Sequence, residues 1–143
     1  MTLAQLLDGR APDTVGVYAG DRRVTRGALD AAATQVASAL HALGATADTA
    51  VAVTLAGPEA IAALFGVWRA GLVHVPVNPR LTDTEVARLL DRVPVAAALT
   101  PAADSTRIDG PVVVVEPDGV RVARRWPPRT RRCAARRARR SSR

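Results

Sequence analysis

The sequence predicts an α/β fold, a parallel βαβαβ sheet with flanking helices, followed by a disordered basic tail. Three observations predict this organisation. Short apolar runs near residues 51–55, 73–77 and 96–99 alternate with segments whose apolar residues recur at i, i+3, i+4 and i+7. Strands that alternate with helices form parallel sheets with right-handed crossovers. From residue 119 onward the chain contains 11 arginines and no acidic residue, so we expect a folded unit over 1–118 and a separate tail over 119–143.

The chain before the first of these strands predicts a hairpin and a helix. Residues 15–18 and 22–24 flank an Ala-Gly-Asp turn, which favours two short antiparallel strands. Thr25 is placed as the N-cap of the helix that follows, because its hydroxyl can accept a free backbone N–H of the first turn. The apolar residues of this helix are interleaved with alanines, and Gly44 ends it.

The stretch 59–79 organises the rest of the chain. Its first half is a helix with one apolar stripe, and Gly71 supplies the left-handed residue that ends such a helix. Alternating valines follow as a short strand, which Pro76 and Pro79 stop. The predicted stripe consists of Ile61, Leu64, Phe65 and Trp68.

A third helix begins after Thr82, which forms a capping box with Glu85 three residues later. Its apolar residues have the same spacing of i, i+3, i+4 and i+7. Two further apolar runs, 96–99 and 112–115, lie between Pro and Asp breaks and complete the expected strands.

The overall composition indicates a cytoplasmic, water-soluble chain. A single cysteine, Cys133, excludes an internal disulfide and any paired-cysteine metal site. The start of the chain has no basic segment before an apolar run, as a signal peptide requires. The most apolar window, about 60–77, is amphipathic and interrupted by Arg, Gly, His and Pro, which argues against a membrane span. All 20 basic residues are arginine, so the chain contains no lysine.

The segment 119–143 shows neither a period of 2 nor one of 3.6 and is rich in Arg, Ala, Pro, Ser and Thr. Such a segment cannot bury enough apolar surface to offset the entropy lost on ordering. We expect it to be disordered and to bind polyanions without sequence preference, through counterion release. Its composition is also that of an off-frame translation of GC-rich DNA, which is a hypothesis about the gene.

Three segments carry a resemblance to one family. VTRGAL at 24–29, VAVTLAGPEAIAALFGVWRAG at 51–71 and LVHVPVNPRLTDTEVARLL at 72–90 resemble the N-terminal part of the adenylate-forming, AMP-dependent synthetases and ligases, which include acyl-CoA synthetases and peptide-synthetase adenylation domains. The resemblance covers about residues 3–118. The sequence departs from the usual family pattern at Arg26, Ala28, Arg69 and His74.

The resemblance implies activation of a carboxylic acid by ATP, with Mg²⁺, followed by transfer to a thiol such as coenzyme A. That chemistry needs a Ser/Thr/Gly-rich loop with lysine around the triphosphate, and a second lysine at the transferred carboxylate. This chain contains neither the loop nor any lysine. The matched motifs are therefore architectural, and we assign no catalytic, cofactor-binding or metal-binding residue.

Several residues could have a functional role, but a simpler structural role is favoured for each of them. His74, between two valines, could face a pocket, but a structural role at this position is favoured. His41 has no second metal donor, Gly57-Pro58-Glu59 lacks a phosphate-loop lysine, and Cys133 reads as an incidental thiol. Asp8, Asp13 and Asp21 are scattered through turns and form no carboxylate pair.

The resulting hypothesis is a fragment of an acyl-CoA synthetase-like ligase of fatty acid metabolism, inactive alone because its ATP site is missing. Two alternatives from other classes remain open. One is a basic nucleic-acid-associating protein on a small α/β scaffold. The other is a non-catalytic partner of a separately encoded remainder of the synthetase.

Overall fold

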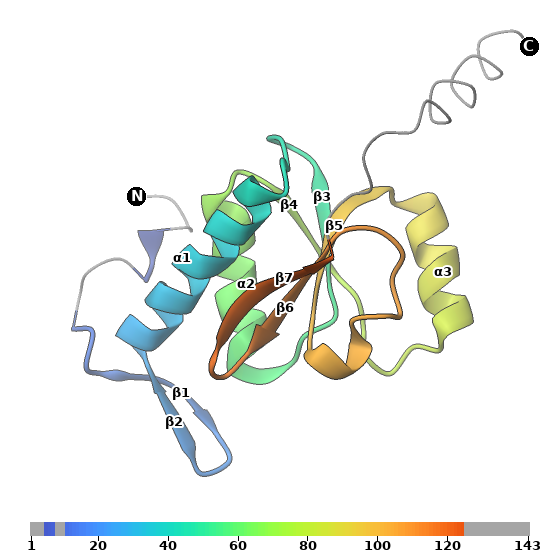
Figure 1. The fold of residues 1–143 in the computed structure, drawn as a ribbon. Helices are drawn as coiled ribbons and strands as arrows, with labels where there is room; N and C mark the ends of the chain where they lie inside the picture. Colours follow the sequence, from blue (N-terminus) through green and yellow to red (C-terminus); the bar gives the residue numbers. More distant parts are fainter. Residues whose placement is uncertain (1–4, 8–10, 125–143) are drawn as a thin grey trace, which may run out of the picture.

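The computed structural model describes residues 5–7 and 11–124. These residues form a small antiparallel hairpin, three α-helices, one 3₁₀-helix and a five-stranded sheet (Figure 1). In chain order, the elements are β1 Val15–Ala19, β2 Arg22–Thr25, α1 Arg26–Ala42, β3 Ala50–Val53, α2 Gly57–Arg69, β4 Val73–Pro76, α3 Asp83–Arg92, β5 Val95–Thr100, η2 Ala102–Asp104, β6 Val112–Glu116 and β7 Gly119–Arg124.

The five-stranded sheet has the order β4-β3-β5-β6-β7. Strands β3, β4, β5 and β6 run parallel, and β7 returns antiparallel to β6. The expected βαβαβ unit is confirmed as β3-α2-β4-α3-β5, with β3 between its two partners. Helices α1 and α2 lie on one face of the sheet and α3 on the other (Figure 1).

Side chains alternate between these two faces along each strand. Val51 and Val53 of β3 point into the main core under α1 and α2, while Ala52 belongs to the smaller core under α3. In β5, Leu99 joins the first core and Ala98 the second. Each fully buried Val or Leu contributes about 1.5–3 kcal/mol to stability, so the two-sided burial of β3 and β5 holds the sheet together.

The helix ends agree with the sequence. The Thr25 hydroxyl accepts the Ala28 N–H at 3.1 Å, and Thr82 and Glu85 form both halves of the capping box. Gly44 and Gly71 have φ angles of +77° and +71°, the left-handed conformation expected just after a helix. Of the helices that the structure describes, none is long and apolar enough to cross a membrane.

The buried face of α2 differs from the predicted stripe. The stripe that starts at Ile61 is only half-buried. The buried residues of α2 are Pro58, Ala62, Ala63, Gly66 and Val67. The helix is apolar on most of its circumference, so periodicity alone does not select the face that packs. Small residues decide the outcome, because they let α2 approach α1 and the sheet closely.

The structure also differs from the expected boundary at residue 119. Residues 119–124 form β7, which pairs with β6 from Glu116↔Gly119 onward. Val120 and Val122 pack against the main core while Arg121 is exposed, a period of 2 that the arginines obscure. The rest of the predicted tail, 125–143, lies outside the described residues.

Candidate functional site

An open hollow of about 560 Å³ lies between α2 and the β4 side of the sheet. Its size is in the range of small-molecule and side-chain binding sites, which are mostly apolar with a few polar groups. Here the polar side chains are His74 and Asn78. The lining residues are Val53, Leu55, Ala60, Ile61, Leu64, His74, Pro76, Val77, Asn78 and Pro79.

Strand register places His74 in this hollow. His74 and Pro76 pair with Val51 and Val53, so they share the sheet face that carries α2. The imidazole is half-buried, and burial lowers the pKa of His74 below its usual value, with a backbone hydrogen bond of the same residue acting in the opposite direction. The structure thus places this histidine on the wall of the hollow.

The amino end of α2 opens near one end of the hollow. Ala56 at the N-cap makes no side-chain cap, so this end has free N–H groups and the positive end of the helix dipole. The first turn, however, carries its own anion, Glu59, which accepts a hydrogen bond from Arg22 at 2.5 Å. An incoming phosphate would therefore meet a carboxylate at this end of α2.

Two threonines mark the carboxyl ends of β3 and β5, where the sheet's connections diverge to opposite sides. In open α/β sheets this is the usual place for a ligand. Thr54 and Thr100 are the buried polar residues of the described chain. The Thr54 N–H donates to Leu99 O at 3.0 Å, and Thr100 Oγ1 has no partner among the described residues. Both side chains are covered by protein, so no accessible site opens there.

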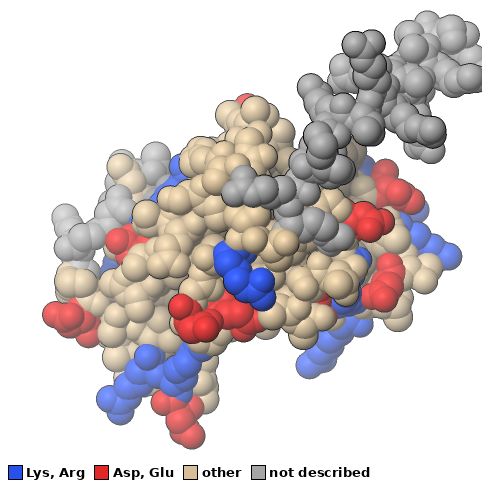
Figure 2. Space-filling model, in the orientation of Figure 1, with Lys and Arg blue, Asp and Glu red and all other residues tan. Residues whose placement is uncertain are grey.

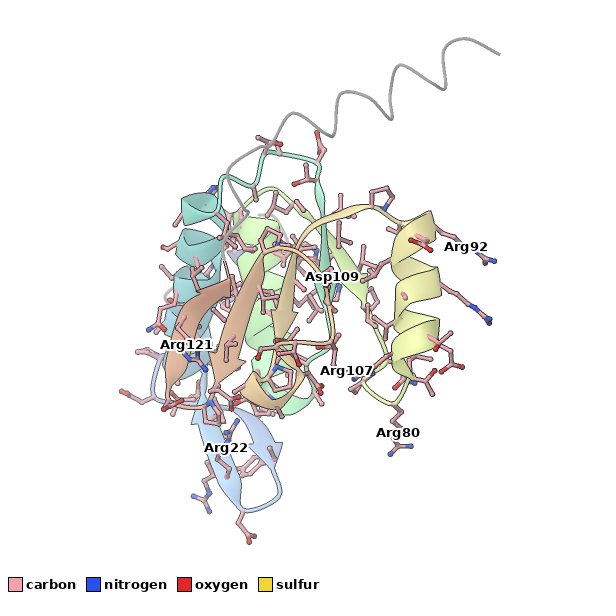
Figure 3. The ribbon with its side chains drawn as sticks, turned by 45° about the vertical axis from the view of Figure 1, so that its right-hand side comes forward. Arg22, Arg80, Arg92, Arg107, Asp109 and Arg121 are labelled. Carbon is pink, nitrogen blue, oxygen red and sulfur yellow. The ribbon has the colours of Figure 1, made fainter. Side chains whose placement is uncertain are left out.

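Arg107 fastens the loop after β4 to the loop after η2. Its guanidinium donates to Leu81 O at 2.5 Å, Pro79 O at 3.3 Å and Asp83 Oδ1 at 2.8 Å, and it lies 3.6 Å from Asp104. The hydrogen bond to Asp83 is the main cause that raises the pKa of Arg107. Figure 3 shows this side chain between the η2 loop and the amino end of α3, while Arg80 and Arg92 point away from the molecule.

A second arginine fastens the two helices of the main core. Arg69, in the last turn of α2, donates to the carboxylate and backbone carbonyl of Asp30 and to Thr34 Oγ1 in α1. This is the position where the sequence departs from the family's usual lysine. The guanidinium reaches these three acceptors from two different nitrogens of a planar group, whereas the three N–H donors of a lysine radiate from one nitrogen.

The remaining residues considered from sequence do not converge. His41 is exposed in the last turn of α1, and Asp13 and Asp21 are exposed on the surface. Asp8 and Cys133 lie outside the described residues. Within 5–7 and 11–124, no group of three or more His, Cys, Asp or Glu side chains could hold a metal ion. On the face drawn in Figure 2, acidic and basic side chains lie close to one another and form no large area of one sign.

These features define a class of protein. It is an open α/β unit with helices on both faces of a mostly parallel sheet, in which arginines fasten elements together and the hollow is apolar. Residues 7–140 match the family described as AMP-binding enzyme, and the chain belongs to that family. The matched range extends beyond the boundary expected at residue 118.

Similar proteins agree with this assignment. The chain is 35% identical over 118 residues to the phosphinothricin tripeptide synthetase PhsC of Streptomyces viridochromogenes, covering 80% of this chain and 11% of PhsC. It is 42% identical over 69 residues to the pyochelin synthetase PchE of Pseudomonas aeruginosa, covering 48% of this chain and 5% of PchE.

Solved structures show the same fold. CmiS6 superposes with a TM-score of 0.69 at 27% identity, covering 84% of this chain and 31% of that one. ATP-bound MatB from Rhodopseudomonas palustris superposes with a TM-score of 0.70 at 22% identity, covering 84% and 26%. The chain therefore spans less than a third of each structure and about a tenth of PhsC. The part of the chain that is matched corresponds to an N-terminal fragment of an adenylate-forming enzyme.

Proposed function

We propose that this chain is an architectural subdomain of an adenylate-forming ligase and does not form an acyl-adenylate by itself. The proposal rests on where the charged side chains of the structure lie. The charged groups of Arg22, Arg69 and Arg107 each bind a carboxylate of a neighbouring element, and the hollow is lined mainly by apolar side chains.

Adenylate formation requires positive groups that stabilise a triphosphate and the charge that develops on the reacting carboxylate. In this family the expected groups include lysines, and the sequence has none. Preorganised donors aimed at developing charge supply the largest single part of such catalysis. A subdomain without them can shape and support a catalytic site that other polypeptide completes.

The acid activated by the complete enzyme is proposed to be an amino acid or an aryl acid rather than a fatty acid. The relatives of highest identity given above are named as peptide and pyochelin synthetases, which supports an adenylation domain of that kind. Neither PhsC nor PchE is named as an acyl-CoA synthetase, so the sequence-based hypothesis of an acyl-CoA synthetase in fatty acid metabolism stays a prediction. A cytoplasmic location, where ATP is abundant, belongs to the same proposal.

The test is pyrophosphate release from ATP by the purified full chain, with panels of amino, aryl and fatty acids. We expect no release above a control without protein. A complete adenylate-forming enzyme assayed in parallel confirms that the assay works. Release that persists through a second purification, and that depends on one acid, would overturn the proposal.

One sequence observation favours a second function. Residues 119–143 contain 11 arginines and no acid, a density of charge that binds nucleic acid through phosphate contacts. Titration of the full chain against DNA of several sequences should then give equal affinities that fall linearly with the logarithm of salt concentration. Tight, sequence-selective binding at physiological salt would make nucleic-acid binding the primary function instead.

A further inference from the structure

The two central strands of the sheet present very different side chains to its two faces. On the face that carries α1 and α2, these strands contribute Val51, Val53 and Leu99 to the main core. On the opposite face, the same strands contribute Ala52 and Ala98 to the smaller core under α3. An alanine offers much less apolar surface than a valine or a leucine, and the free energy of burial is proportional to that surface. The sheet therefore holds α3 more weakly than it holds the other two helices.

Helix α3 in turn brings little apolar surface to the sheet. Val86 is its only buried residue, Leu89 and Leu90 are half-buried, and its other residues are exposed, whereas α1 and α2 bury several residues each. The capping box of Thr82 and Glu85 stabilises the helix itself without joining it to the sheet. Segments with few buried apolar contacts open locally at a lower free-energy cost than the rest of a fold.

One arginine joins α3 and the loop before it to the other side of the smaller core. Arg107 lies in the segment between β5 and β6, and its three guanidinium nitrogens donate to Pro79 O, Leu81 O and Asp83 Oδ1. All three acceptors belong to the loop after β4 or to the first residue of α3 (Figure 3). A single side chain thus connects this whole segment to the loop after η2.

Both ends of the segment are anchored in the sheet. Before it, the Val77 N–H donates to Val53 O at 2.8 Å, and after it, Val95 pairs with Ala50. The segment between these two points can therefore leave the sheet and return without any strand losing its partner.

We propose that residues 78–93, the loop after β4 together with α3, form a flap that opens as one unit while the main core stays folded, and that Arg107 keeps this flap closed. Opening exposes the small residues of the sheet under α3. It also moves Asn78 and Pro79, which line the hollow beside α2, so the position of the flap changes the shape of the hollow.

Hydrogen exchange of the full chain, followed residue by residue by NMR in low concentrations of urea, tests the flap. Its reporters are the backbone amides of Leu81, Val86 and Val93, each of which donates to a carbonyl within the segment at 3.0–3.1 Å. In the wild type, we expect these amides to exchange faster than those of α1. Their rates should also depend less on urea, because opening the flap exposes less surface than unfolding the whole chain.

Three variants separate the flap from the main core. Val36→Ala weakens the main core, so the amides of α1 should exchange at least about tenfold faster while the flap amides keep their rates. Arg107→Gln should accelerate the flap amides at least about threefold, and those of α1 by no more than the same factor. Arg80→Gln is the matched control, since this side chain lies in the same loop but points away from the molecule, and it should leave the flap amides unchanged (Figure 3).

Three results would overturn the proposal. Equal rates and an equal urea dependence for flap and α1 amides in the wild type would show that the chain opens as a single unit. An acceleration of the flap amides by Val36→Ala as large as that of the α1 amides would show the same. If Arg107→Gln and Arg80→Gln exchange alike, Arg107 does not hold the flap. Should Val36→Ala fail to fold, the urea dependence of the wild type decides between one unit and two.

Discussion

Gly66 offers the sharpest test of the packing between α1 and α2. A Cβ added at this glycine would lie 2.5 Å from Val36 Cγ1, 2.6 Å from Val36 Cβ and 2.8 Å from the backbone oxygen of Ala33. Atoms at these distances overlap. The valine side chain has some freedom to move, whereas the carbonyl oxygen belongs to the backbone of α1, so the two helices would have to separate.

The direction of the effect distinguishes packing from helix propensity. In an exposed helix, replacing Gly with Ala stabilises by about 1 kcal/mol. At Gly66 we expect the opposite, a net loss of about 1–3 kcal/mol, the usual cost of an extra methyl group in a packed core. For a domain of this size, the melting temperature should fall by at least about 4 °C.

Urea unfolding of Gly66→Ala, followed by circular dichroism, measures the change. Val36→Ala combined with Gly66→Ala should recover part of the loss relative to the sum of the single variants, by about 0.5–3 kcal/mol, since the contacts with the valine disappear. Ser38→Ala, at an exposed position of α1, is the control and should change stability by less than about 0.5 kcal/mol. A Gly66→Ala variant as stable as the wild type would refute the close approach of the helices.

Three further predictions concern charged and titratable groups. Arg107→Lys should lower the melting temperature and speed proteolysis of the loop after β4, because Asp83, Pro79 O and Leu81 O are bound by three separate guanidinium nitrogens and a lysine has one nitrogen. Unchanged proteolysis would contradict this. His74 has a folded-state pKa below its unfolded value, so its contribution to stability is complete above about pH 6.5 and is lost as the pH falls below that value. His74→Gln should make folding stability depend less on pH in this range, and an unchanged dependence would exclude a contribution from His74. The pKa of Glu85 is lowered, first by the hydrogen bond from the Thr82 backbone N–H. The Glu85 carboxylate therefore stabilises the fold above about pH 4.3, and this stabilisation is lost as the pH falls through the folded-state pKa. Glu85→Gln should reduce the loss of folding stability that an acid titration measures.

The parts of the fold predicted from sequence are those that local chemistry determines. The Thr82 capping box and the stop at Gly71 each depend on a few neighbouring residues, and both are confirmed. The βαβαβ unit also follows from the alternation of elements. Strand β7 was missed because Arg121 lies between Val120 and Val122 and Arg124 follows them, so charged residues concealed a two-residue period.

The candidate site could not be predicted in the same way. The hollow arises from the pairing of His74 with Val51, and from the choice of which face α2 buries. The sequence favoured the stripe containing Leu64, whereas Gly66 and its small neighbours are buried and leave Leu64 at the hollow. Both features are set by contacts between residues far apart in the chain, which a periodic pattern does not contain.

The central position of β3 has a consequence for how this chain folds as it is synthesised. Both neighbours of β3 come later in the sequence, β4 about 20 residues and β5 about 45 residues further on. The Thr54–Leu99 backbone hydrogen bond closes the longer of these loops. Until Leu99 leaves the ribosome, one edge of an almost entirely apolar strand has no partner, and non-local pairing of this kind is slow. During synthesis the chain therefore exposes an unpaired apolar strand edge, which chaperones bind. Shortening the time between the synthesis of β3 and that of β5 should improve the yield of folded protein.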